Sequence, residues 1–212
     1  MKSFPKGVYI TVCFLFFSTL SFAQVLPVKS GDVLNWKNTS FVAVGRDVAD
    51  GAQTVESSPV KIDSASGERT YAYTAGLVRR SKLFAVLQRG DRILPADRSF
   101  DLLPQSLSAG EKWKHTTYDR SDRCGRIKYE YEVTSTEGPE VVVKVNGALT
   151  KLKTIMVVHE GVWYSAACGG SGRAYLKYVF SPELYELVEI ENRYFYNGFL
   201  TTGSKAVLES VN

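Results

Sequence analysis

The chain has 212 residues, with 26 Lys and Arg against 22 Asp and Glu, and a formal net charge of +4. Without Lys2 and Lys6 of the N-terminal segment the balance is 26 − 2 = 24 basic against 22 acidic residues, and the charges are interspersed. A nucleic-acid-binding role needs a basic run or stripe, so the composition excludes it. The 12 Tyr and 17 Gly residues are typical of a protein built from strands and turns.

Residues 1–23 are predicted to be a signal peptide. Lys2 and Lys6 precede an uncharged apolar run, and Ser21-Phe22-Ala23 forms a small-x-small cleavage site before Gln24. The run is shorter than the ~20 residues that a membrane span needs. An uncleaved N-terminal anchor is the alternative. We expect a periplasmic or secreted protein, with no integral membrane segment in the mature chain.

Two stretches of the mature chain are alike. The segment that begins at Trp36 matches the one that begins at Trp113 in residue type, and a Gly-acid pair precedes each of them. The match predicts two related segments, in which the two Trp residues are buried at corresponding strand starts. Coincidence remains the alternative, because any strand start uses such residues.

The first half of the mature chain, residues 24–100, predicts loosely organised strands. Residues 36–44 form one strand that ends at Gly45, and residues 69–75 form another. Residues 77–89 carry an apolar cluster too short to separate a buried strand from a helix. Residues 95–104 are predicted to be a connection, which sets a boundary before a C-terminal segment of residues 101–212. We expect both segments to form one domain.

In the second half of the mature chain, apolar and polar residues alternate clearly. Residues 127–133 place apolar and charged side chains on opposite faces, and Asn146-Gly147 is a strong hairpin signal. Residues 169–172 are predicted to be a glycine-rich loop. Ser181-Pro182-Glu183 predicts one helical turn before a long strand. The fold class predicted is all-β: antiparallel sheets forming a curved half-barrel or sandwich.

The order of motifs after Leu103 carries a family resemblance. The motifs are Gly110-Glu111-Lys112-Trp113, Val143-Lys144-Val145-Asn146-Gly147, Trp163-Tyr164, and Ser181-Pro182-Glu183-Leu184 before Val188. In this order they resemble a family of uncharacterised secreted all-β domains of Gram-negative bacteria, over about half the chain. The family usually has Pro where this chain has Asn146. The resemblance implies an envelope domain without a known catalytic constellation, and it supplies no functional residues.

Catalytic residues are not predicted. His159-Glu160-Gly161 lacks the second His of a zinc-protease motif, and two His residues are few for a metal site. His115 and His159 are interpreted as strand-surface residues. Ser171 lies in a loop that only partly matches a nucleophile elbow, and the same loop could instead hold an anion through backbone amides and Arg173. A hydrolase using His159 or the Ser171 loop therefore stays as an alternative function.

Tyrosines are the main candidates for a binding site. A face rich in Tyr can line a ligand cleft or a protein interface, although such rings can also fill a core. The candidate ligand-binding residues are Tyr129, Tyr131, Tyr164, Tyr194, Tyr196 and Arg173.

Cys124 and Cys168 are the cysteines that remain after the signal segment. An even count in an exported chain predicts a disulfide between them, and two free thiols are the alternative.

The function predicted is a periplasmic or secreted, non-catalytic binding or interaction module of the bacterial envelope, with no cofactor and no metal. Its partner is expected to be an envelope protein or an apolar small molecule. In the second case the protein would be a carrier, with the molecule held in a half-barrel cleft.

Overall fold

The computed structural model describes residues 27–121 and 125–212, so the predicted signal peptide and Cys124 lie outside the described residues. Within them the chain forms fourteen strands in one continuous sheet and one short 3-10 helix, η1, of Ala96–Arg98. The strands are β1 (Val33–Val44), β2 (Asp47–Ile62), β3 (Arg69–Tyr73), β4 (Gly76–Arg80), β5 (Val86–Arg89), β6 (Arg92–Ile93), β7 (Lys112–Ser121), β8 (Gly125–Glu137), β9 (Val141–Val145), β10 (Ala148–Leu152), β11 (Ile155–Ser165), β12 (Gly170–Ser181), β13 (Glu186–Tyr196) and β14 (Phe199–Val211).

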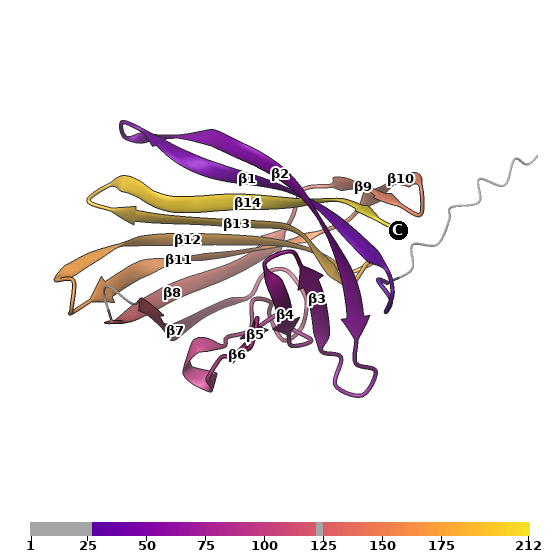
Figure 1. The fold of residues 1–212 in the computed structure, drawn as a ribbon, viewed down its shortest axis with the longest axis horizontal. Coiled ribbons are helices and arrows are strands. Elements are labelled where there is room, and N and C mark those ends of the chain that lie inside the picture. Colours follow the sequence, from indigo (N-terminus) through magenta and orange to yellow (C-terminus); the bar gives the residue numbers. More distant parts are fainter. Residues whose placement is uncertain (1–26, 122–124) are drawn as a thin grey trace, which may run out of the picture.

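The strands follow the order β6-β5-β4-β3-β2-β1-β14-β13-β12-β11-β8-β7 (Figure 1). Every pairing along this path is antiparallel, and β9 joins the end of β14 through a short parallel contact. The sheet is open and curved, so the prediction of an all-β fold with a curved antiparallel half-barrel is confirmed. No helix among the described residues is long and apolar enough to cross a membrane.

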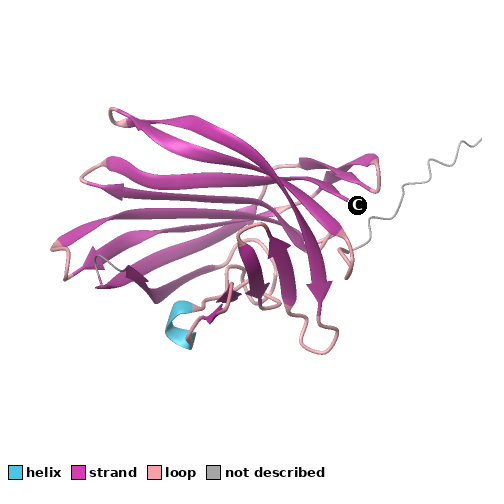
Figure 2. Ribbon diagram, in the orientation of Figure 1, coloured by secondary structure: helices cyan, strands magenta, loops and turns pink. Residues whose placement is uncertain are grey.

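The long strand β2 joins two parts of the sheet. Its first part pairs with β1, and its last residues, from Val60 onward, pair with β3 instead. The small strands β3 to β6 and η1 therefore lie against one face of the large sheet (Figures 1 and 2). We call this the inner face and the opposite one the outer face. Because β1 also pairs with β14, residues from both predicted segments share one sheet.

The core lies between the inner face and the small strands. Its buried apolar side chains come from both halves of the chain. Alternate residues of the long strands face inward, as the period of two requires. On the outer face the same strands carry charged residues, among them Lys177, Glu189 and Glu191. This division matches the alternation predicted for the second half of the chain.

Two turns form as their sequence predicts. Asn146-Gly147 and Asn197-Gly198 each place both residues at positive φ, between 48° and 86°, and each closes a hairpin. Asn and Gly tolerate this left-handed region, which fits the twist of the flanking strands.

Two local predictions need correction, and one open alternative is decided. The predicted helical turn at Ser181 is a tight turn between β12 and β13, in which Ser181 Oγ accepts a hydrogen bond from the Leu184 amide at 3.3 Å. The predicted loop at residues 169–172 is mostly strand, because β12 begins at Gly170. Residues 77–89, for which strand and helix were both open, lie largely in two strands, β4 and β5.

The two matching Trp residues differ in burial. Trp36 is 3% exposed, whereas Trp113 is partly buried. Both lie near the start of a strand that opens a hairpin, β1 with β2 and β7 with β8. The prediction that both Trp residues are largely buried is therefore confirmed for Trp36, and Trp113 is less buried than predicted. That the two segments superpose stays a prediction.

Candidate functional site

A cleft of about 470 Å³ lies between the inner face and the small strands. Its floor is formed by inward-facing side chains of β8, β12 and β13, and its walls come from β4 to β6, η1, the segment that follows η1, and β7. The volume falls in the range of small-molecule sites, which is about 300–1,000 Å³.

Four tyrosines line the floor of the cleft: Tyr129, Tyr131, Tyr178 and Tyr194. The rings of Tyr129 and Tyr131 are parallel, with centroids 6.0 Å apart, and Tyr194 lies edge-on to Tyr129 at 6.1 Å. The hydroxyls of Tyr129 and Tyr178 form no hydrogen bond to any residue that the structure describes. The floor therefore offers flat ring surfaces together with hydroxyl donors.

Burial raises the pKa of all four tyrosine hydroxyls. At Tyr178 the positive charges of Arg80 and Arg89 oppose this rise in pKa, and at Tyr194 the charge of Arg89 does so. The hydroxyls therefore stay protonated at neutral pH, and the two arginines lie near enough to act on them.

Arginines supply most of the charge of the cleft. Asp119 is the single acidic residue among the lining residues. Within residues 27–121 and 125–212, none of the lining arginines forms an ion pair. These arginines are Arg80, Arg89, Arg92, Arg98 and Arg120.

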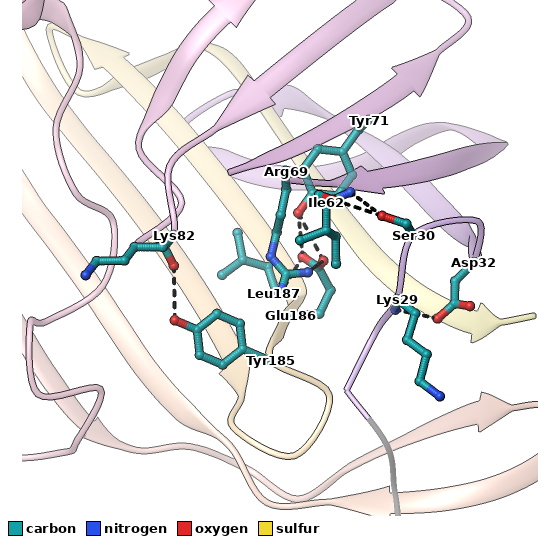
Figure 3. Close-up of polar contacts among 10 residues, drawn as sticks. All are labelled: Lys29, Ser30, Asp32, Ile62, Arg69, Tyr71, Lys82, Tyr185, Glu186 and Leu187. Carbon is teal, nitrogen blue, oxygen red and sulfur yellow. Dashed lines mark hydrogen bonds and ion pairs between the residues drawn. The ribbon is translucent and has the colours of Figure 1, made fainter. Parts of the chain in front are cut away.

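A buried ion pair fixes the small strands to the large sheet. Arg69 of β3 donates to the Glu186 carboxylate of β13 at 3.3 Å, and the Tyr71 hydroxyl donates to it at 3.0 Å (Figure 3). The amide of Leu187 donates to the same carboxylate at 2.9 Å. Burial raises the pKa of Glu186, and the charge of Arg69 opposes that rise. The Arg69 guanidinium also lies 5.1 Å from the ring centroid of Tyr185.

A second contact fixes the connection that follows η1. His159 Nε2 lies 3.2 Å from the Leu102 carbonyl oxygen, which makes Nε2 the protonated nitrogen. The His159 ring packs against His115, Trp113 and Phe100, with centroids 5.2, 6.1 and 5.7 Å away.

The interpretation of both histidines as strand-surface residues is wrong for His159, which is 0% exposed, and incomplete for His115. Phe100 stacks on the His115 ring at 4.3 Å, so the connection covers both rings. Burial lowers the pKa of His115 to about 4 and that of His159 to about 3.

Helix η1 is held to the edge of the large sheet. Arg126 forms an ion pair with Asp97 at 3.1 Å and lies 3.7 Å above the Tyr118 ring. Thr117 Oγ1 donates to the Asp97 carbonyl oxygen at 3.1 Å. Arg98 directly follows Asp97, so these contacts fix the backbone from which its side chain lines the cleft.

The predicted binding residues divide between the two faces. Tyr129, Tyr131 and Tyr194 line the cleft. Tyr196 lies beside it and stacks on Trp163 at 5.9 Å. Tyr164 and Arg173 lie on the outer face. Tyr164 pairs with Lys128 and Arg173 pairs with Val162, and both partners point outward.

Sequence reasoning missed the rim of the cleft. The five arginines come from four separate strands and one helix, and no local pattern joins them. Tyr178 alternates with Leu176 on β12, and that alternation could have identified it as an inward-facing residue.

The residues considered for hydrolysis lie on opposite faces of the sheet. Ser171 lies in β12 opposite Tyr164, on the outer face, whereas His159 is buried on the inner face. The glycine-rich segment that could have held an anion is paired in the sheet from Gly170 onward. Among the described residues, no group of three or more His, Cys, Asp or Glu residues could hold a metal ion.

The outer face carries two further hollows, of about 430 and 710 Å³. Several of their charged residues form ion pairs: Lys177 and Arg193 both pair with Glu191, at 2.9 and 2.7 Å, and Lys114 pairs with Glu132. The inner cleft differs from these hollows because its positive charges have no such partners.

No protein-family model and no curated protein matches the chain. A solved structure from Parabacteroides distasonis, of a protein classed as a lipoprotein, is similar with a TM-score of 0.46 at 16% identity, over 89% of this chain and 98% of that chain. A protein from Bacteroides fragilis, classed as exported and described as having a YmcC-like fold, gives a TM-score of 0.35 at 14% identity over the same shares.

Proposed function

We propose that the protein is an exported, non-catalytic binding module of the bacterial envelope, and that its ligand lies in the inner cleft. The signal-peptide pattern of residues 1–23 supports export. The observation that carries the proposal is the cleft itself, in which a floor of tyrosine rings meets a rim of arginines that have no acidic partner.

The arrangement favours binding over catalysis. The two histidines are enclosed in an aromatic cluster and are neutral at physiological pH, since burial lowers the pKa of both. Neither histidine is within reach of Ser171, which lies on the other face. The charged rim also favours a ligand that carries charge over the purely apolar molecule considered from the sequence alone.

Native mass spectrometry of the exported protein tests the proposal. We expect a bound small molecule that is released unchanged on denaturation. Leu94→Trp, which narrows the cleft, should lose it, and Val162→Trp on the outer face should retain it. Release of the molecule in a chemically altered form would identify an enzyme and contradict the proposal. Loss of the molecule in the Val162 variant alone would place the site elsewhere.

A protein partner is the second candidate. The first part of β2 has β1 on one side and no described strand on the other. Beside this edge, Val42, Val44 and Val55 are 44%, 59% and 69% exposed. An open edge with apolar side chains can accept a strand from another protein. A pull-down from the host envelope tests this candidate. A partner that binds the native protein and the Leu94→Trp variant, but not the Val44→Asp or Val55→Asp variant, would support it.

A further inference from the structure

The rim arginines surround the cleft from three directions. Arg80, Arg89 and Arg92 come from the small strands, Arg98 from η1 and Arg120 from β7. Like charges gathered around one concave site repel one another, and a cleft with protein walls focuses their field. Arg80 is held in place by a hydrogen bond to the Phe84 carbonyl oxygen at 3.2 Å, and not by an acidic neighbour.

Four described arginines outside the cleft form ion pairs: Arg69, Arg79, Arg126 and Arg193 pair with Glu186, Glu68, Asp97 and Glu191. The cleft instead gathers five arginines around one acidic residue, Asp119, and so carries an excess of positive charge. A ligand that brings negative charge would supply the missing partners, and Arg is suited to this because its fork binds carboxylate, phosphate or sulfate in a bidentate manner.

The floor determines the rest of the ligand. Tyr129 and Tyr131 present parallel rings on β8, and Tyr194 of β13 lies edge-on to Tyr129 beside them. Ring faces of this kind bind flat or apolar surfaces. Protonated tyrosine hydroxyls add neutral hydrogen-bond donors beside the guanidinium groups.

We propose that the inner cleft binds a polyanion with a ring-shaped body, whose two or more anionic groups reach arginines on different walls while its ring packs against the tyrosines of the floor. This inference rests on the proposed function, since it names the class of ligand for the same cleft. The volume of about 470 Å³ admits one such molecule or one segment of a longer one.

The mature protein titrated with pyranine, a trisulfonated pyrene, tests the inference by fluorescence anisotropy. We expect 1:1 binding that weakens steeply as the salt concentration rises. Arg89→Gln and Arg92→Gln should each weaken binding by about 10-fold, the loss typical of a charged hydrogen bond. Both side chains are exposed and unpaired among the described residues, so their replacement leaves the fold intact.

Matched controls remove the same charge elsewhere. Arg46 lies at the β1–β2 turn and Arg173 on the outer face, both exposed. Arg46→Gln and Arg173→Gln should leave pyranine binding unchanged. Equal losses in all four variants would show that only the net charge matters and would overturn the inference. No pyranine binding at low salt would overturn it as well.

Two sugar probes distinguish the sources of such a ligand. Trigalacturonate carries carboxylates on saccharide rings, and maltotriose is its neutral counterpart. Displacement of pyranine by trigalacturonate would identify the ligand class as an acidic saccharide. Failure to displace it would identify the class as an aromatic anion. Displacement by maltotriose at equal concentration would overturn the requirement for charge. A native ligand that Leu94→Trp releases but that carries no anionic group would overturn the polyanion inference and leave the proposed function intact.

Discussion

Arg69 and Glu186, 117 positions apart in the chain, form a buried ion pair at 3.3 Å that joins β3 to β13. The pair holds the small strands, and with them one wall of the cleft, over the inner face (Figure 3). Removal of one member leaves the other charge buried without its partner, which is more costly than loss of the pair as a whole.

We expect Arg69→Ala to lower the free energy of unfolding by about 3–5 kcal/mol, because the Glu186 carboxylate then stays buried with only neutral donors. Urea unfolding at pH 7.5 measures this. The control is Lys114→Ala, which breaks the exposed pair with Glu132 and should cost less than ~1 kcal/mol. Similar losses for the two variants would contradict a structural role for the buried pair.

Acidification should destabilise the protein between about pH 6.5 and pH 5. Burial lowers the pKa of His159 to about 3 and that of His115 to about 4, so the unfolded chain binds protons in this window and the folded chain does not. The stabilisation is complete above the unfolded pKa of ~6.5 and is lost as the pH falls. His159 should contribute about 1.4 kcal/mol per pH unit, and His115 less because its ring is partly exposed.

Urea midpoints at pH 7.5, 6 and 5 measure this slope, and the same measurements on His159→Phe separate the histidine from Glu186, whose pKa burial raises. His159→Phe should flatten the slope, whatever its effect on stability at pH 7.5. A slope that the variant does not change would place the titrating group elsewhere.

The two matching Trp residues should contribute differently to the free energy of unfolding. Trp36 is almost fully buried, so Trp36→Ala should cost about 3–5 kcal/mol. Trp113→Ala should cost less, because part of the indole is exposed at the edge strand β7. Chemical denaturation of both variants checks the order, and a larger loss at Trp113 would reverse it.

Gly172 is predicted to be required for the packing of Trp163. A Cβ at this position would lie 2.6 Å from Trp163 Nε1 and would clash with the Phe195 carbonyl oxygen, to which that Nε1 donates at 3.1 Å. Gly172→Ala should therefore destabilise the protein by about 1–3 kcal/mol, as overpacking does. Gly170→Ala is the matched control, because its new Cβ meets only the movable Tyr196 ring at 3.1 Å. Equal melting temperatures for the two variants would contradict this reading.

Local features of the fold could be predicted from the sequence, whereas the cleft could not. Asn146-Gly147 determines its own backbone conformation, and alternation along β8 and β12 determines which side chains face inward. The burial of His159 depends on a connection that begins some 60 positions earlier and folds over it. The arginine rim depends likewise on how β4 to β6, η1 and β7 are arranged in space. Contacts of this range leave no periodic signal in a single sequence.

The disulfide between Cys124 and Cys168 stays a prediction, because Cys124 lies outside the described residues. The register around it favours the bridge: Ile127 of β8 pairs with Ser165 of β11, three positions from each cysteine. A Cβ on Gly125, the residue after Cys124, would lie 3.7 Å from the Ala167 Cβ, next to Cys168.

A bridge across these 168 − 124 = 44 positions should stabilise the protein by about 4 kcal/mol through the entropy of the unfolded chain. We expect no reactive thiol when the exported, unreduced protein is denatured and titrated with a thiol reagent, and a lower melting temperature after reduction. Cys124→Ser and the double variant Cys124→Ser/Cys168→Ser should lose the same stability, since either change opens the bridge. Two titratable thiols per mature chain, or a melting temperature that reduction leaves unchanged, would show that the cysteines are not paired.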